Sequence, residues 1–319
     1  MGETSNKAKM AELVSSELFN VFGWKKIGSM NQNWNCAIAK HNKKTHPSDV
    51  VLRYIDPYSN KAVYINCDLK SYAKDSIQKH GIAGAVSSLV SATECMQFSD
   101  QWYNIYYQNG DDADRRGLLF VYNHDGEYDA SFKNMLATIN EKNFSIRRGS
   151  KMYIMGPWDI AYLKTVTNDI EVLRGRGVLP VASECNFFYP DLVRKKVSSD
   201  ANTAATIEML LGPWLALQYM HEAKSKVLFY YKHRGDYTDE FLYFIDYLAH
   251  YQLLQNADEI IVKFANASQT CAGNFKKAID EYAKIQGVQG VEKRLEKIKY
   301  ESVTNIVTRF SEIEIGMED

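Results

Sequence analysis

The chain lacks the features that mark membrane and secreted proteins. It has 319 residues and no apolar run near the roughly 18 residues that a membrane span needs. Its first residues, Met1 to Lys7, contain no apolar segment typical of a signal peptide. Gly2 begins a pattern similar to a myristoylation signal, but Asn6 occupies the position where Ser or Thr is required. We therefore expect a cytoplasmic protein that does not act at a membrane.

Metal-binding and disulfide spacings are missing as well. The five cysteines form no CxxC pair, and the seven histidines form no HExxH motif. The cysteines are therefore expected to be reduced thiols in the core. His41 and His46 lie in a lysine-rich segment, where we expect solvated side chains rather than zinc ligands.

No internal repeat, low-complexity tract or excess of one charge is present either. With 45% apolar residues, the chain can form two ordinary domains or one large domain with a sizeable core. The net charge of −1 says little about nucleic-acid binding, because local clusters of Lys and Arg decide it. Such clusters occur at Lys40 to Lys44, Arg115-Arg116, Arg147 to Lys151 and Arg194 to Lys196. Each by itself predicts a solvated surface.

The most informative segment is Asp68-Leu69-Lys70, which ends the strand-like run that begins at Ala62. Because side chains alternate across a strand, Asp68 and Lys70 share one face with Tyr64, while Leu69 points to the opposite face and into a core. A strand with one apolar face and charged residues at the end of its other face predicts a functional site.

A predicted hairpin brings a second carboxylate to this strand. The apolar run 50–55 is followed by turn-forming residues from Asp56 to Asn60 before the strand at Ala62. If residues 57–60 form the loop, Asp49 lies opposite Asp68, with Cβ atoms roughly 5 Å apart. Two facing carboxylates are destabilising unless a cation or a shared proton compensates, which favours a divalent metal site.

Two other acidic positions suit structural roles better. Asp56 lies about seven residues along the hairpin from Asp68, or roughly 23 Å, too far to share a metal. The acidic segment from His124 to Asp129 has the glycine and spacing of a turn, and its similarity to a calcium loop is too short.

The order of predicted elements indicates an α/β protein. A helix is predicted over 7–22, ending at Gly23, and strands are predicted over 34–40, 49–55 and 62–70. Alternating helices and strands follow over 71–98, 117–122, 132–141, 151–155, 159–174 and 178–188.

A polar break from Ser198 to Thr203 predicts a boundary between a domain over 1–198 and a second α/β domain over 199–319. The second domain has helices predicted over 206–222, 238–254 and 272–285, and strands over 226–231 and 259–264. Its many aromatic residues are expected to pack in the core, and the alternative is a surface that stacks bases or binds a partner.

Residues 8 to about 122 resemble the PD-(D/E)XK nuclease superfamily, which has the restriction endonuclease-like fold. The predicted order matches its αβββαβ core, and Asp49, Asp68 and Lys70 match its two acidic positions and its lysine. Glu12, shortly before Gly23-Trp24, matches a glutamate typical of the Holliday-junction-resolvase-like and Mrr-like branches. The sequence departs from the family name in having Ser48 between Pro47 and Asp49.

The resemblance implies phosphodiester hydrolysis with Mg²⁺ or Mn²⁺. The metal ligands would be Asp49, Asp68 and the Leu69 carbonyl. Lys70 would orient or deprotonate the attacking water, and Glu12 would extend the metal or water shell. Glu17 is an alternative to Glu12, because it lies closer to the middle of the apolar face of the predicted helix.

The resemblance favours a DNA endonuclease acting as a restriction or antiviral-defence effector. A homodimer or a regulatory protein partner is compatible with this role, and the C-terminal domain would select the substrate or partner. The alternative is a catalytically inactive nuclease-like fold that binds nucleic acid or protein. Retention of all four acid and lysine positions argues for activity.

Overall fold

The computed structural model describes residues 2–108, 110, 112–139, 147–190, 204–286 and 291–303. They form two compact units that meet in sequence between Ala161 and Tyr162. The boundary predicted near residue 198 lies outside the described residues. Each unit is a mixed α/β structure with a five-stranded sheet, in agreement with the predicted fold class. Within these ranges, no helix combines the length and apolar character needed to cross a bilayer.

The sheet of the first unit has the strand order β1-β4-β5-β6-β7. Its strands are β1 (Lys25–Ile27), β4 (Val50–Ile55), β5 (Ala62–Tyr72), β6 (Ala113–Asn123) and β7 (Lys151–Met155). The β1-β4-β5 part is antiparallel, and β5, β6 and β7 are parallel. With helix α1 before β1 and helix α2 between β5 and β6, this is the predicted αβββαβ order.

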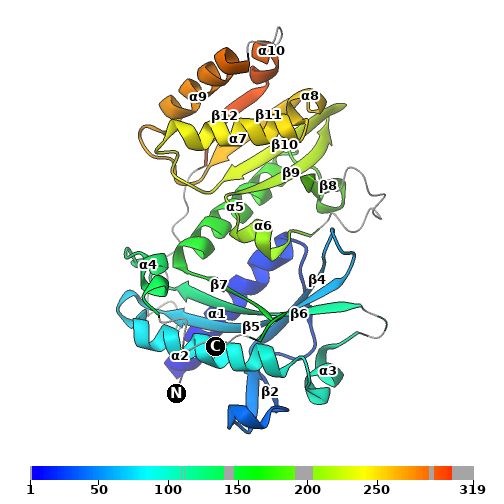
Figure 1. The fold of residues 1–319 in the computed structure, drawn as a ribbon, viewed down its shortest axis with the longest axis vertical. Coiled ribbons are helices and arrows are strands. Elements are labelled where there is room, and N and C mark those ends of the chain that lie inside the picture. The colour runs from blue at the N-terminus through cyan, green and yellow to red at the C-terminus, as the bar shows by residue number, and fades with distance from the viewer. Residues whose placement is uncertain are drawn as a thin grey trace. The chain divides into compact units, whose positions relative to one another are not determined.

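Helices α1 (Gly2–Val21) and α2 (Lys79–Cys95) cover opposite faces of this sheet (Figure 1). Phe120 of β6 contacts Phe19 of α1, with ring centroids 5.9 Å apart. Its neighbour Leu119 packs in a cluster with Leu89 of α2. Because neighbouring strand residues face opposite sides, these contacts place the two helices on the two faces. The shorter helices of this unit are α3 (Asp100–Tyr106), α4 (Phe132–Ala137) and the 3₁₀ turns η1 (Ala39–His41) and η2 (Lys74–Ser76).

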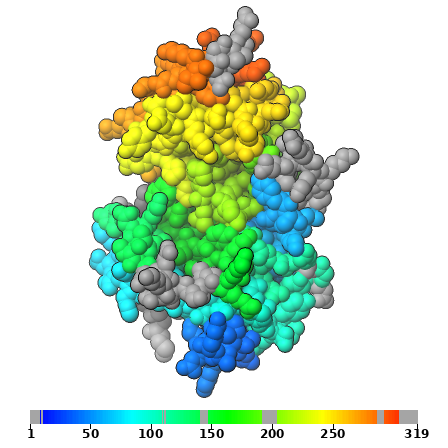
Figure 2. Space-filling view, in the orientation of Figure 1, coloured from blue at the N-terminus to red at the C-terminus, as the bar shows by residue number. Residues whose placement is uncertain are grey.

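The strand predicted over 34–40 is wrong as a member of the main sheet. Strands β2 (Gln32–Asn35) and β3 (Thr45–Ser48) form their own two-stranded sheet, and this segment makes a separate lobe in the space-filling view (Figure 2). The first meander strand is β1 instead. It escaped the sequence pattern because it has three residues, two of them exposed lysines. The predicted helix over 71–98 is likewise shorter, because β5 continues to Tyr72.

The second unit has a sheet with the order β12-β11-β10-β9-β8, in which β10, β11 and β12 are parallel. Its strands are β8 (Cys185–Phe187), β9 (Trp214–His221), β10 (Lys224–Tyr231), β11 (Glu259–Phe264) and β12 (Ile298–Ser302). Its helical segments are α6 (Ile207–Leu211), α7 (Thr238–His250), α8 (Leu253–Asn256), α9 (Cys271–Gln286), α10 (Val291–Leu295) and the 3₁₀ turn η4 (Ala182–Glu184). Helix α5 (Pro157–Gly175) contains the division between the units.

The prediction of a helix over 206–222 is wrong beyond residue 211. Helix α6 ends at Leu211, before Gly212-Pro213, and the apolar run that follows is strand β9. An apolar run of this length does not distinguish a buried strand from a helix by its pattern. Pairing of β9 with both β8 and β10 decides its conformation.

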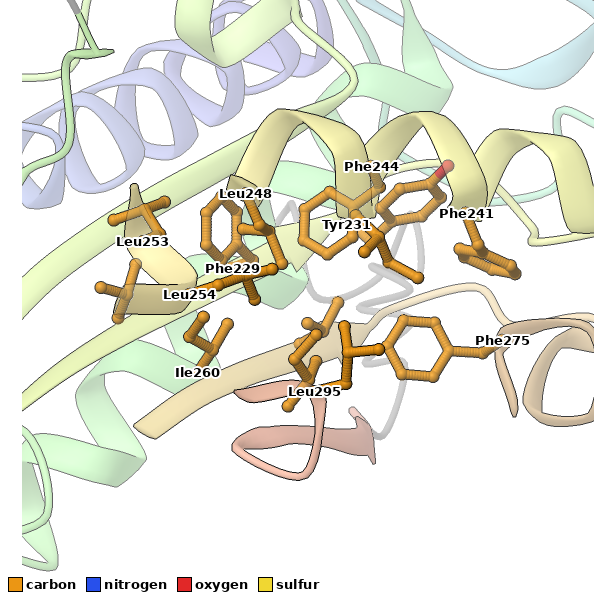
Figure 3. Close-up of a cluster of buried hydrophobic side chains, with 14 of the residues drawn as sticks. Phe229, Tyr231, Phe241, Phe244, Leu248, Leu253, Leu254, Ile260, Phe275 and Leu295 are labelled. Carbon is orange, nitrogen blue, oxygen red and sulfur yellow. The ribbon is translucent and has the colours of Figure 1, made fainter. Parts of the chain in front are cut away.

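Most aromatic side chains of the second unit pack in its core, as expected from the sequence. Phe229 and Tyr231 of β10 face Phe241 and Phe244 of α7, and Phe275 of α9 completes this aromatic cluster (Figure 3). Perpendicular and tilted ring pairs of this kind add stabilisation beyond the burial of apolar area.

Candidate active site

Asp49 occupies the bend between β3 and β4, at the point where the chain enters the main sheet. The β4–β5 ladder pairs Val50 with Cys67 and continues to Ile55 with Ala62, which confirms the predicted hairpin register. The backbone N–H of Asp49 donates to the Cys67 carbonyl over 3.2 Å. Asp49 therefore lies one position beyond the terminal pair Val50–Cys67, beside the segment Asp68-Leu69-Lys70.

The Asp49 carboxylate accepts a hydrogen bond from the part of β5 that extends beyond its pairing with β4. The Leu69 N–H donates to Asp49 Oδ2 over 2.6 Å, in place of a backbone carbonyl of β4. In a strand, the N–H and C=O of one residue point to the same neighbouring strand. The Leu69 carbonyl therefore lies on the edge that Asp49 covers, where it can serve as an oxygen ligand.

Asp68 and Lys70 share one face of β5 and form an ion pair, as the alternation predicted. Their partners in the parallel register, Leu119 and Val121 of β6, pack in the core under α2, so this is the α2 face of the sheet. That face is buried along most of β5 and opens only at its end, where 12% of Asp68 and 31% of Lys70 are exposed. The charged end of β5 is thus accessible to solvent, whereas the apolar part of this face is buried.

The electrostatics of the site suit a cation between the two carboxylates. Burial raises the pKa of Asp49, the Leu69 N–H partly offsets this effect, and the charges of Asp68 and Glu12 raise the pKa further. Burial alone would lower the pKa of Lys70, but the neighbouring carboxylates of Asp68 and Asp49 raise it above its usual value. The Lys70 ammonium is therefore a retained positive charge. A donor set of two carboxylates and a strand carbonyl fits a hard divalent ion.

The two candidate helix acids have different surroundings. Glu12 accepts a hydrogen bond from the Asn31 side-chain amide over 2.8 Å, and the Asn31 backbone N–H donates to the Asp49 carbonyl over 2.9 Å. Glu12 is thus connected to Asp49 through one residue. Glu17 is exposed, and its charge acts on Tyr122 rather than on Asp49. Asn31 adopts a positive φ of 53° to make both contacts, a conformation that asparagine tolerates.

Buried hydrogen bonds hold the residue before Asp49. The indole N–H of Trp34 in β2 donates to Ser48 Oγ over 2.9 Å, and Ser48 in turn donates to the Asn66 side chain of β5. Ser48 and Trp34 are fully buried. The serine that separates Pro47 from Asp49 therefore anchors Asp49 to the small β2–β3 sheet and to β5.

The acidic residues assigned to turns have those roles. Asp56 accepts from the backbone N–H groups of Tyr58 and Ser59 over 3.0 and 2.9 Å, which stabilises its own turn at the far end of the hairpin. Asp125 accepts from the backbone N–H of Lys74 over 2.8 Å and from the Asn123 side chain over 2.6 Å. Both carboxylates are therefore occupied by structural hydrogen bonds.

The basic clusters divide between structural and surface roles. Arg116 is buried and pairs with Asp114 over 2.9 Å, and Arg115 donates to the carbonyls of Met96 and Gln97. The solvated surface expected for this pair is therefore wrong. The cluster at 194–196 lies outside the described residues.

The expectation of solvated histidines in the lysine-rich segment is also wrong. His46 is completely buried, and only 7% of the His41 side chain is exposed. Both approach Cys36 and Cys95. The sequence signal was the even spacing of Cys36, His41 and His46, with four residues between successive members. The fourth member is distant in sequence, so no short motif includes it.

Comparison with known proteins identifies the first unit. Residues 1–159 match the family model described as the GAPS4 protein PD-(D/E)XK nuclease domain. No curated protein matches the chain. The matched range ends close to the division between the units and includes Glu12, Asp49, Asp68 and Lys70. Through this N-terminal unit, the chain belongs to the PD-(D/E)XK nuclease superfamily.

Proposed function

We propose that this nuclease is a metal-dependent DNA endonuclease with its active site at Asp49, Asp68 and Lys70. The observation that carries the proposal is the 2.6 Å hydrogen bond from Leu69 to Asp49, which holds two carboxylates and a lysine at one strand end. Enzymes of this superfamily typically use divalent metals.

The residues present fit Mg²⁺ or Mn²⁺. Asp49, Asp68 and the Leu69 carbonyl would hold the ion, since all three offer hard oxygen donors at the open edge of β5. When bound, the ion would lower the pKa of a water and neutralise charge that develops on the phosphate.

The side chains around this metal position bind and orient. Lys70 keeps its proton beside Asp68, so its ammonium orients the attacking water and attracts the phosphate rather than acting as the base in this state. Glu12, joined to Asp49 through Asn31, adds a carboxylate to the water shell. Ser48 keeps Asp49 in place.

The finer parts of the proposal follow from the resemblance to the Holliday-junction-resolvase-like and Mrr-like branches, which act on DNA. In this context the protein would be a cytoplasmic restriction or antiviral-defence effector. The second unit would recognise the substrate or a regulatory protein. A homodimer would supply the two active sites that symmetric double-strand cutting needs.

The test is cleavage by the full chain of closed circular plasmid, linear duplex, single-stranded DNA and RNA, with Mg²⁺, Mn²⁺ or EDTA. Cutting of closed circles identifies an endonuclease, because they have no ends. We expect Asp68→Asn to abolish cutting and the matched variant Asp56→Asn to retain it, since Asp56 lies at the opposite end of the hairpin and asparagine still accepts its turn bonds.

The competing function is a nuclease-like fold that only binds. Binding of DNA without cutting under every metal condition would support that function and contradict ours. Equal cleavage by the wild type and Asp68→Asn would place the active site elsewhere. Preferential cutting of RNA would correct the substrate class and leave the site assignment intact.

A further inference from the structure

Four potential metal ligands converge outside the nuclease site, between the β2–β3 sheet and the end of α2. Cys36 follows β2, His41 ends η1, His46 lies in β3, and Cys95 is the last residue of α2. One ligand atom from each residue lies within 4.8 Å of the other three. All four residues belong to the first unit.

Two of the separations between these atoms match those of a tetrahedral zinc site. Cys36 Sγ lies 3.7 Å from Cys95 Sγ and 3.6 Å from His41 Nδ1. Around a tetrahedral zinc ion with Zn–S of about 2.3 Å and Zn–N of about 2.0–2.1 Å, two sulfurs lie about 3.8 Å apart, and sulfur and nitrogen about 3.6 Å apart. Cys36, Cys95 and His41 are therefore already at the sulfur–sulfur and sulfur–nitrogen separations that zinc requires, and the His46 ligand atom lies within 4.8 Å of each of them.

His46 needs a partner that the described protein atoms do not supply. The residue is completely buried, and neither ring nitrogen has a hydrogen-bond partner among the described residues. Its ring contacts Trp34 and the edge of His41, with centroids 5.0 and 5.4 Å away. A buried imidazole without a polar partner is costly, and a metal bond to one nitrogen would satisfy it.

The surroundings have the hydrogen bonds expected around metal ligands. His41 presents Nδ1 to Cys36, while its Nε2 lies 3.3 Å from Glu94 Oε2, so a carboxylate can fix the ring and its tautomer. Lys40 pairs with the other oxygen of Glu94 over 2.7 Å. The Ala37 N–H donates to Cys95 Sγ over 3.0 Å, which would stabilise a thiolate.

We propose that Cys36, His41, His46 and Cys95 bind a structural zinc ion. Two thiolates and two imidazoles are ligands that zinc prefers, whereas Mg²⁺ prefers carboxylate and carbonyl oxygens. Four protein ligands leave no open position, so this ion has a structural role and is distinct from the catalytic metal.

The zinc ion would connect the basic segment to the nuclease site. It ties the stretch between β2 and β3 to the end of α2, and its ligand His46 precedes Asp49 by three residues. Together with the bonds from Trp34 to Ser48 and from Ser48 to Asn66, it would fix the strand that delivers Asp49. Loss of zinc should therefore lower both the thermal stability and the nuclease activity.

The rival explanation of the close sulfurs is a redox pair. Cys36 and Cys95 are free thiols in the structure, and a disulfide would bring their sulfurs to about 2.05 Å. Such a pair would not require two histidines at the same point. A disulfide also leaves both nitrogens of His46 without a partner.

The experiment measures metal content of the full chain, purified without chelator and dialysed, by inductively coupled plasma mass spectrometry. We expect about one zinc per chain in the wild type, in Cys185→Ser and in Asp68→Ala. We expect at least a tenfold lower content in Cys95→Ser. Cys185 is the matched control because it is a buried cysteine of the second unit.

A second measurement uses wild-type protein alone, because loss of zinc from Cys95→Ser would also follow if that variant failed to fold. Zinc is removed and replaced with Co²⁺, and the visible spectrum is recorded. Tetrahedral d–d bands with a sulfur-to-cobalt charge-transfer band are expected. Their absence, or a Co²⁺ spectrum of octahedral oxygen coordination, would overturn the proposal.

Further results of these experiments would contradict zinc binding or assign the ion to another site. A wild-type protein without zinc, or a Cys36–Cys95 disulfide found by mass spectrometry under non-reducing conditions, contradicts zinc binding. Full zinc content in Cys95→Ser does so as well. Zinc that is lost in Asp68→Ala but kept in Cys95→Ser would assign the ion to the nuclease site. An inactive protein that contains zinc in the predicted pattern would refute the proposed nuclease function and leave this inference standing.

Discussion

The backbone N–H of Leu69 donates to the side chain of Asp49 over 2.6 Å, so one carboxylate ends the pairing between β4 and β5. This contact has two consequences. It places Asp49 beside Asp68, and it leaves the strand edge at Leu69 free of a neighbouring backbone. A structural role and the proposed catalytic role are therefore combined in one side chain.

Separate substitutions of Asp49 should divide these two roles. Asp49→Asn keeps an acceptor for the Leu69 N–H but removes the charge, whereas Asp49→Ala removes both. We expect both variants to lose nuclease activity by at least about 100-fold. Only Asp49→Ala should lower the free energy of unfolding, by about 0.5–1.5 kcal/mol, as measured by urea titration. Equal stability of the two variants would contradict the structural role.

Lys70→Met tests whether the lysine acts on water or on the metal. The ammonium pairs with Asp68, so its removal frees that carboxylate and should leave Mn²⁺ affinity equal or higher in calorimetry. Cleavage should nevertheless fall by about 10²-fold or more, because the group that we propose to orient the water is lost. Loss of Mn²⁺ binding, or cleavage within a few-fold of wild type, would contradict this role.

Glu12→Gln and Glu17→Gln form a matched pair on α1. Glu12 is connected to Asp49 through Asn31 and raises the pKa of Asp49, whereas Glu17 is exposed. We expect Glu12→Gln to lower the single-turnover cleavage rate by about tenfold or more and Glu17→Gln to change it by less than about twofold. The reverse result would make Glu17 the helix acid.

A buried ion pair in the second unit should be sensitive to loss of one partner. Lys263 Nζ lies 2.9 Å from Asp169 Oδ2, and the Tyr230 hydroxyl donates to the same oxygen over 2.7 Å. Lys263→Met leaves a buried carboxylate without its counter-charge and should cost about 3–5 kcal/mol in urea unfolding. The exposed control Lys224→Met should cost less than about 0.5 kcal/mol.

Combining Lys263→Met with Asp169→Leu should recover part of that loss, since no uncompensated charge is left in the core. A double variant less stable than Lys263→Met would show that the aspartate stabilises this unit through Tyr230 instead.

Two glycines of the first unit should respond in opposite directions to alanine. A Cβ at Gly117 in β6 would collide with Thr93 Oγ1 and lie 3.3 Å from Leu89 Cγ, whereas a Cβ at Gly84 in α2 meets nothing within 4 Å. We expect Gly117→Ala to destabilise by about 1–3 kcal/mol. Gly84→Ala should stabilise by up to about 1 kcal/mol, because alanine has the higher helix propensity. Thermal unfolding of both variants checks the prediction.

The elements that depend on short-range rules could be predicted from the sequence. The turn formers between Ile55 and Ala62 and the two-residue period of strands were enough to predict the register that places Asp49 next to Asp68. The conformation of 206–222 could not be predicted in this way, because its apolar run has no period that separates a buried strand from a helix. Strand β1 is too short to show any pattern.

By itself, the sequence determined the chemistry available to this protein and the local elements that carry it, because side-chain type, strand alternation and turn propensity act over a few residues. Tertiary structure decided which groups meet. Only the folded sheet leaves the edge at Leu69 open, connects Glu12 to Asp49 through Asn31, and brings Cys95 to Cys36 across 59 positions of sequence. Contacts at that separation depend on how helices and sheets pack, which no local spacing records.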